Sequence, residues 1–132
     1  MRYLLDTNAV SDLVRNPQGK IATRIADLGE GSVCTSIIVA AELRYGAAKK
    51  GSERLLAQLV TVLGALEILP FETPADIAYG EIRARLEAAG KPIGGNDMLI
   101  ASQAISLGLT IVTDNQREFS RVEALRFENW FR

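Results

Sequence analysis

Short apolar runs alternate along this chain with longer segments in which apolar residues recur at helical spacing. The apolar runs are of strand length. Between them, residues such as Ile21, Ile25 and Leu28 fall on one face of a helix. Strands that alternate with helices are typical of a mostly parallel sheet covered on both faces. We therefore expect an α/β fold, a three-layer α/β/α sandwich around a sheet of about five strands, at residues 2–6, 33–35, 66–70, 109–113 and 125–127.

Capping signals suggest where the helices begin and end. Asn16 and Thr73 each precede a proline, a pattern that predicts a helix start. Ser36 is suited to cap a helix that runs to about residue 50, where Gly51 ends it. Further helices are predicted around residues 55–63, from the Thr73 signal to Gly90, over 96–107, and near 116–121.

The composition narrows the possible chemistry. The 132 residues are the length of one domain, so we expect a single domain over 1–132. The chain has one cysteine and no histidine, which excludes an internal disulfide, His-based catalysis and Cys/His zinc sites. No apolar stretch is long enough to span a bilayer, and Asp6 interrupts any signal-peptide core, so a cytoplasmic location is expected. An enzyme with this composition needs carboxylates, hydroxyls, basic residues or a hard metal ion.

Four acidic residues stand where an α/β sheet places its ligands. Asp6 and Asp114 each follow a predicted strand, and Asp97 follows Gly94-Gly95 at the start of a predicted helix. Each of these three also has a plain structural interpretation as a helix cap, a turn residue or a partner of the helix dipole. Glu42 differs, because it lies inside an apolar stretch, where a carboxylate is costly unless it is paired or metal-bound.

Together these acids indicate a metal site. Clustered carboxylates raise each other's pKa unless a cation neutralises them. An all-oxygen set of ligands suits Mg²⁺, with Mn²⁺ as an alternative. Such ions activate water and stabilise phosphoryl oxygens. The residues alone therefore predict metal-dependent phosphate chemistry.

Four stretches of the chain resemble a known family. They are LLDTNAVSDLVR near the N-terminus, SIIVAAELRYGAAK around Glu42, RARLEAAGKPIGGNDMLIASQA around Asp97, and GLTIVTDNQREFSRVEALRFENW at the end. In combination, order and spacing they resemble the PIN-domain ribonucleases, and more specifically the VapC toxins of bacterial VapBC toxin–antitoxin modules. The resemblance covers nearly the whole chain. One departure is Gly95, which stands where the family's PIGPxD segment has proline.

The resemblance implies a PIN-like fold and a Mg²⁺-dependent endoribonuclease that is inhibited by a cognate VapB antitoxin. It places Asp6, Glu42 and Asp97 on three of the family's acidic positions, with Asp6 and Asp97 as the principal metal ligands. The PIG-x-x-D and VT-x-N-x-REF motifs are those of a subgroup that includes enzymes cutting initiator tRNA in the anticodon loop. The resemblance also implies a homodimer and an antitoxin tail that enters the acidic site with an Arg or Lys in place of the metal.

The fourth acidic position has three candidates: Asp114, Asn115 and Glu118. The family commonly carries T-x-D after the fourth strand, and in that register Asn115 stands where the acid is usual. We expect Asp114 to contribute the charge and Asn115 to donate hydrogen bonds to a metal-bound water. Glu118 is the alternative, since it lies four residues beyond Asp114 and can share its face if a helix has begun.

RNA approaching an acidic site needs basic residues nearby to offset the repulsion of its phosphates. The net charge of −1 excludes a basic field over the whole protein, so local cations are required. We expect Arg44, Arg83 and Arg117 to serve as substrate-binding residues, with Lys49 and Lys50 as further candidates.

Two other functions fit parts of the pattern. Residues 6–10 nearly match the D-x-D-x-[TV] loop of haloacid-dehalogenase-like phosphatases, but Asn8 replaces the second Asp, which would be the general acid. A non-catalytic module that binds RNA or a protein through the same site is the other alternative. The complete set of acids gives no support to an inactive site.

Overall fold

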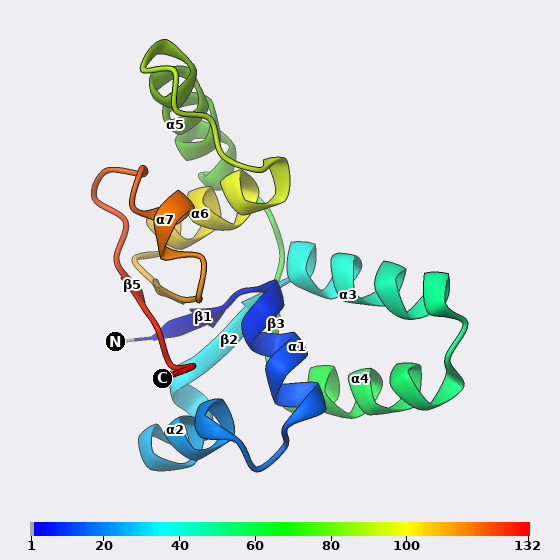
Figure 1. Cartoon of the computed structure of the whole chain (residues 1–132). Coiled ribbons are helices and arrows are strands. Elements are labelled where there is room, and N and C mark those ends of the chain that lie inside the picture. The colour runs from blue at the N-terminus through cyan, green and yellow to red at the C-terminus, as the bar shows by residue number, and fades with distance from the viewer. Residues whose placement is uncertain (1) are drawn as a thin grey trace.

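The computed structural model describes residues 2–132. Its centre is a sheet of five strands in the order β3-β2-β1-β4-β5, and all of the strand pairs are parallel. Helices flank this sheet (Figure 1). The expected α/β architecture with a central five-stranded parallel sheet is thereby confirmed. The strands are β1 (Tyr3–Leu5), β2 (Val33–Ser36), β3 (Glu67–Leu69), β4 (Thr110–Val112) and β5 (Phe127–Glu128).

The helices occupy most of the segments between the strands. Two helices follow β1 and two follow β2, whereas a short 3₁₀ turn leads into β2 and a one-turn helix follows β4. α5 and α6 pack on each other, as do α3 and α4 (Figure 1). The helices are α1 (Thr7–Arg15), α2 (Lys20–Leu28), η1 (Glu30–Ser32), α3 (Ile37–Lys50), α4 (Glu53–Ala65), α5 (Ala75–Ala88), α6 (Gly95–Leu107) and α7 (Gln116–Phe119).

The strand order reverses at β1. The chain adds β2 and β3 on one side of β1 and then places β4 and β5 on the other. Leu5 is therefore in register with Thr35 on one side and with Val112 on the other. In open parallel sheets such a switch point, at the carboxyl ends of the strands, is where ligands bind. The residues that follow β1 and β4 lie at this point.

The core lies on both faces of the central strands. Leu4 and Leu5 of β1 and Ile111 and Val112 of β4 are completely buried. Because both faces of these strands are covered, their sequences are continuous apolar runs rather than alternating ones. This rigid centre fixes the positions of the residues at the strand ends.

Two predicted helix starts are wrong. α2 begins at Lys20 with Gly19 as its N-cap, and Asn16 instead accepts a turn hydrogen bond from the Gly19 amide (2.9 Å). α5 begins at Ala75 with Pro74, not Thr73, as its N-cap. The predicted Ser36 cap and Gly51 end of α3 are confirmed. The last strand lies at Phe127–Glu128, slightly later than predicted.

Within residues 2–132, no helix combines the length and the apolar character needed to cross a membrane.

Candidate active site

Asp6 stands at the end of β1 and caps α1. Its amide donates to the Val112 carbonyl of β4 (3.1 Å), and its Oδ1 accepts from the Ala9 amide (2.9 Å). The side chain is almost completely buried, with 3% exposure. The structural interpretation of Asp6 as a cap is thus confirmed, and the same bonds place its carboxylate at the switch point of the sheet.

The environment of Asp6 disfavours its charged form. Burial is the main cause and raises the pKa of Asp6 to about 6, although the Thr113 hydroxyl and the Ala9 amide donate to the carboxylate and oppose the rise. The negative charges of Asp114 and Glu42 raise the pKa further. Three acids predicted from distant parts of the sequence therefore lie close enough to repel each other.

Glu42 reaches the same region from α3. Its side chain is half-buried, and its Oε1 accepts from the Thr7 hydroxyl on α1 (2.8 Å). Among residues 2–132, no salt bridge involves Glu42. A hydroxyl donor, rather than a basic residue, therefore fixes this carboxylate while leaving its negative charge in the cluster.

Asp97 lies in the first turn of α6 and is half-buried. Its Oδ2 accepts from the Asn115 side-chain amide (3.2 Å). The pKa of Asp97 is raised to about 7, chiefly by burial, then by a hydrogen bond with Glu118 and the charges of Glu118, Asp6 and Glu42. Burial and the neighbouring acids therefore favour the protonated form of Asp97, whereas the pKa of Glu118 is lowered.

Of the three candidates for the fourth acidic position, Asn115 and Glu118 interact with Asp97, whereas Asp114 interacts with Asp6. Asn115 donates its side-chain amide to Glu118 Oε2 (2.8 Å) as well as to Asp97, and this donation is the main cause that lowers the pKa of Glu118. Asp114 is exposed, accepts from the Asn8 side-chain amide (3.0 Å), and acts on Asp6 through its charge. Both acids join the cluster, but Glu118 has the direct contact with Asp97.

Three hydroxyl and amide residues of the site escaped the sequence interpretation as functional positions: Thr7, Asn8 and Thr113. The completely buried Thr113 hydroxyl donates to Asp6 and accepts from the Asn115 amide (2.8 Å). The available signal was position, because each of these residues lies within two positions of an acid at a strand end. Together they connect the carboxylates of β1, α3 and β4 through hydrogen bonds.

The basic residues proposed for substrate binding lie on three different helices. Arg44 on α3 and Arg117 on α7 are exposed. Arg83 on α5 donates instead to Glu87 (2.9 Å) and to the Tyr79 hydroxyl (3.0 Å). These two partners within α5 already occupy Arg83, which weakens the case that it contacts a substrate.

The donor set of this cluster fits a hard divalent cation. All of its charged groups are carboxylates, and among residues 2–132 none of them forms a salt bridge. Burial chiefly, and the neighbouring carboxylates in addition, raise the pKa values of Asp6 and Asp97 and so disfavour their charged forms in the absence of a cation. Among residues 2–132, no three of the carboxylates lie together as a metal-binding group in the present arrangement of their side chains.

Comparisons with known proteins agree with this arrangement. The family model described as "PIN domain" matches residues 3–125. The chain is 40% identical to the tRNA(fMet)-specific endonuclease VapC of Salmonella typhimurium and 42% identical to ribonuclease VapC2 of Haemophilus influenzae, over 98% of both chains in each case. The crystal structure of VapBC2 from Rickettsia felis, bound to a DNA fragment from its promoter, matches with a TM-score of 0.92 and 39% identity. The match covers 98% of this chain and 99% of the other.

The protein belongs to the PIN-domain family and, within it, to the VapC ribonucleases of toxin–antitoxin systems. PIN-domain ribonucleases generally depend on a divalent metal ion. The family also decides between the functions left open by the sequence, because it supports a nuclease rather than a phosphatase or a non-catalytic module.

Proposed function

We propose that this protein is the toxin of a VapBC-type module and acts as a Mg²⁺-dependent endoribonuclease, with Mn²⁺ as an alternative ion. The observation that carries the proposal is the convergence of Asp6, Glu42, Asp97, Asp114 and Glu118 at the switch point, where none of them forms a salt bridge among residues 2–132. Such a set of carboxylates attracts a divalent ion. An ion held there suits displacement at the phosphorus atom of a phosphodiester.

The proposed roles follow from the position of each side chain. Asp6 and Asp97 hold the ion as its principal ligands, because short carboxylates at rigid element ends suit a small octahedral ion. Glu42, fixed by Thr7, orients the attacking water. Asp114 and Glu118 complete the charge, and Asn115 holds Asp97 and Glu118 in place. When bound, the ion supplies Lewis-acid activation of water and stabilisation of the phosphoryl oxygens.

The proposed substrate is a transfer RNA, with initiator tRNA cut in its anticodon loop as the specific target. The name of the Salmonella typhimurium relative, which is 40% identical over nearly the full length, supports this choice. Residues 2–132 present no RRM-type aromatic platform for reading a long sequence, which favours recognition of a shaped RNA loop. The exposed Arg44 and Arg117 contact its phosphates in this proposal.

The proposed protein partners are a VapB-type antitoxin and a second copy of this chain. The related structure from Rickettsia felis is a VapBC2 complex, which supports an antitoxin. A largely apolar cavity of about 300 Å³ offers such a partner a place to dock. The antitoxin tail would then enter the acidic site with an Arg or Lys in place of the metal. The cavity is lined by Leu13, Pro17, Ala22, Ile25, Ala26, Glu30, Val33, Thr61, Val62, Ala65 and Leu66.

We further propose that residues 1–132 form one domain and that the protein acts in the cytoplasm, where tRNA is found.

Sequencing the new RNA ends that appear after expression of the protein tests this function. We expect one dominant cut in the anticodon loop of initiator tRNA, and no new ends when Asp6→Asn is expressed to the same level. Cuts spread over many messenger RNAs with tRNAs intact would overturn the tRNA assignment. Equal cutting by the Asp6→Asn variant would overturn the role of the acidic site.

A further inference from the structure

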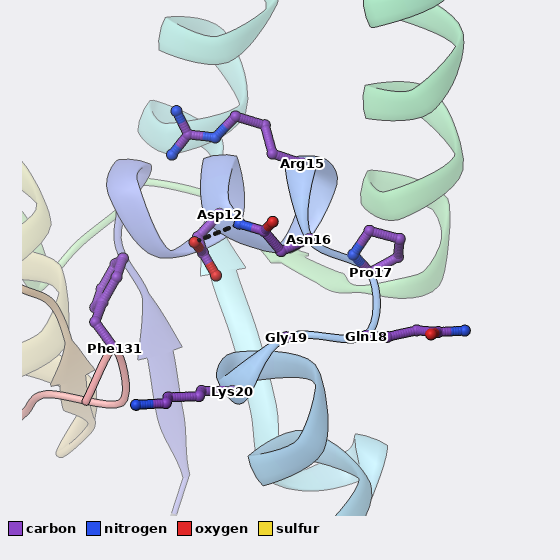
Figure 2. Close-up of a pocket in the computed structure, with 8 residues that line it drawn as sticks. All are labelled: Asp12, Arg15, Asn16, Pro17, Gln18, Gly19, Lys20 and Phe131. Atoms are coloured by element: carbon purple, nitrogen blue, oxygen red, sulfur yellow. Dashed lines mark hydrogen bonds between the residues drawn. The ribbon is translucent and has the colours of Figure 1, made fainter.

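A polar cavity lies along α1, the helix that Asp6 caps, and is not part of the acidic cluster. Its volume is about 530 Å³, enough for one nucleotide, and it opens between the end of α1, the start of α2 and the C-terminal tail (Figure 2). The lining residues include both charges, amides and one aromatic ring. They are Asp12, Arg15, Asn16, Pro17, Gln18, Gly19, Lys20 and Phe131.

Two walls of this cavity continue directly from the acidic cluster. Asp12 lies six residues after Asp6, which corresponds to about 9 Å along α1. On the other wall, the Thr113 amide donates to the Glu128 carbonyl of β5 (3.0 Å), and Phe131 follows three residues later. A strand of RNA held at Asp6 therefore needs to advance only a short distance to reach the cavity.

The groups in the cavity are arranged for a ligand with both a ring and polar atoms. Asp12 Oδ1 accepts from the Asn16 side-chain amide (2.9 Å), which fixes the carboxylate, and within residues 2–132 no hydrogen bond is made to Oδ2. Figure 2 shows Asp12, Lys20 and Phe131 turned toward the same part of the cavity, whereas Arg15 and Gln18 point away from it. The Phe131 ring is half-buried against the core, which limits its motion.

We propose that this cavity is a nucleobase subsite of the ribonuclease, an inference that rests on the proposed function. An unpaired base close to the cut stacks on Phe131, and Asp12 Oδ2 accepts a hydrogen bond from its exocyclic amino group. Lys20 contacts the phosphate of the same nucleotide, since the described residues give this lysine no salt bridge. The subsite thereby adds a specificity determinant that the acidic cluster lacks.

The chemistry of Asp12 selects among the bases. A carboxylate only accepts hydrogen bonds, so it suits adenine, cytosine or guanine, each of which carries an amino group on its Watson–Crick edge. Uracil offers no amino group there, and its single N3–H donor is flanked by two carbonyl oxygens that repel the carboxylate. The subsite is therefore expected to accept an amino-bearing base and to disfavour uracil.

Base replacement in a substrate hairpin tests the subsite. After the cut has been mapped, each flanking nucleotide is replaced singly by its counterpart without the amino group: adenosine by purine riboside, cytidine by 2-pyrimidinone riboside, and guanosine by inosine. We expect one position at which the replacement lowers kcat/KM of the wild type by about tenfold. Asp12→Ala should lose a similar factor on the parent RNA and become insensitive to the replacement. Asp27→Ala, which removes an exposed carboxylate of α2 that does not line this cavity, is the matched control.

A binding measurement provides a second test that needs no cleavage. Hairpins carrying 2-aminopurine at each flanking position are titrated with the Asp6→Asn protein, which keeps the cavity intact. We expect stacking on Phe131 to quench the fluorescence at one position, and Phe131→Leu in the same background to remove that quenching and weaken binding about tenfold. Leucine keeps an apolar side chain in the core contact, and a thermal melt verifies the fold.

The results separate failure of the subsite from failure of the proposed function. If the wild type cleaves RNA but every base replacement changes kcat/KM by less than twofold, or if Asp12→Ala keeps the wild-type sensitivity, the subsite is refuted and the proposed function stands. If the wild type cleaves no RNA, the proposed function fails. In that case unchanged fluorescence at every 2-aminopurine position would refute the subsite as well.

Discussion

At the scale of single residues, Asp6 combines a structural and a chemical task. Its carboxylate caps α1 through the Ala9 amide, yet it is buried among other acids that raise its pKa to about 6. A cap residue on an exposed surface keeps its charge at little cost, whereas this one is charged at neutral pH only against desolvation and repulsion. That conflict makes a measurable prediction about stability.

We predict that Asp6→Asn is more stable than the wild type at pH 8 in the absence of divalent ions. The unfolded chain releases the Asp6 proton near pH 3.8 and the folded chain near pH 6, so the wild type loses stability as the pH rises between these values. The asparagine variant avoids this loss and still accepts from the Ala9 amide. The expected difference is about 3 kcal/mol at pH 8 and below about 1 kcal/mol at pH 4.

Urea denaturation in EDTA at pH 4 and pH 8 measures this difference. Asp27→Asn, at an exposed position of α2, is the matched control and should show no comparable gain. A variant Asp6→Asn that is equally or less stable than the wild type at pH 8 would contradict the electrostatic account of the site.

The fourth acid is a second prediction at this scale. From the sequence we expect Asp114 to contribute the fourth charge, but in the structure Glu118 is the acid that contacts Asp97 and is held by Asn115. We expect both Glu118→Gln and Asp114→Asn to slow RNA cleavage, by about tenfold or more for Glu118→Gln and by less for the exposed Asp114→Asn. Cleavage rates at several Mg²⁺ concentrations provide the comparison. A normal Glu118→Gln with an inactive Asp114→Asn would restore the order favoured by the sequence.

At the scale of elements, the strands were predictable because each is a short, continuously apolar run. Two helix starts were not, since a cap followed by proline also begins ordinary turns. At Asn16 the carbonyl accepts the Gly19 amide in such a turn, and α2 starts only afterwards. The acids at the strand ends were predictable from architecture. Their hydrogen-bond donors were not predictable. Thr7 donates to Glu42 and Thr113 to Asp6 only because the fold brings β1, α3 and β4 together.

Helix capping connects element stability to the site. The Ser36 hydroxyl accepts from the Ile38 amide at the start of α3, the helix that carries Glu42 (3.0 Å). Ser52 caps α4 in the same way through Leu55 (3.1 Å), but α4 carries none of the acids. We predict that Ser36→Ala and Ser52→Ala each lower the free energy of unfolding by about 1 kcal/mol. Only Ser36→Ala should also slow cleavage, through the looser position of Glu42.

Denaturation curves and cleavage rates of the two serine variants at saturating Mg²⁺ separate these effects. Equal cleavage by both variants would mean that the start of α3 does not position Glu42.

At the scale of the whole molecule, the parallel sheet explains why distant acids converge. Asp6 follows β1, Glu42 lies on the helix after β2, and Asp114 follows β4, so the strand order brings them to one edge although they are far apart in the chain. Asp97 joins them from α6, which leads into β4. A metal ion bound there would therefore stabilise the contacts between both halves of the sheet.

The most direct test of this account is the rate at which the purified protein cleaves initiator tRNA as a function of Mg²⁺ concentration, measured for the wild type and for folded Asp97→Asn. We predict a saturable rise for the wild type, no cleavage in EDTA, and a rate at least about a hundredfold lower for Asp97→Asn at every concentration. Cleavage by the wild type in EDTA at its full rate, or wild-type activity in Asp97→Asn, would contradict the assignment of the acidic cluster as the metal-dependent active site.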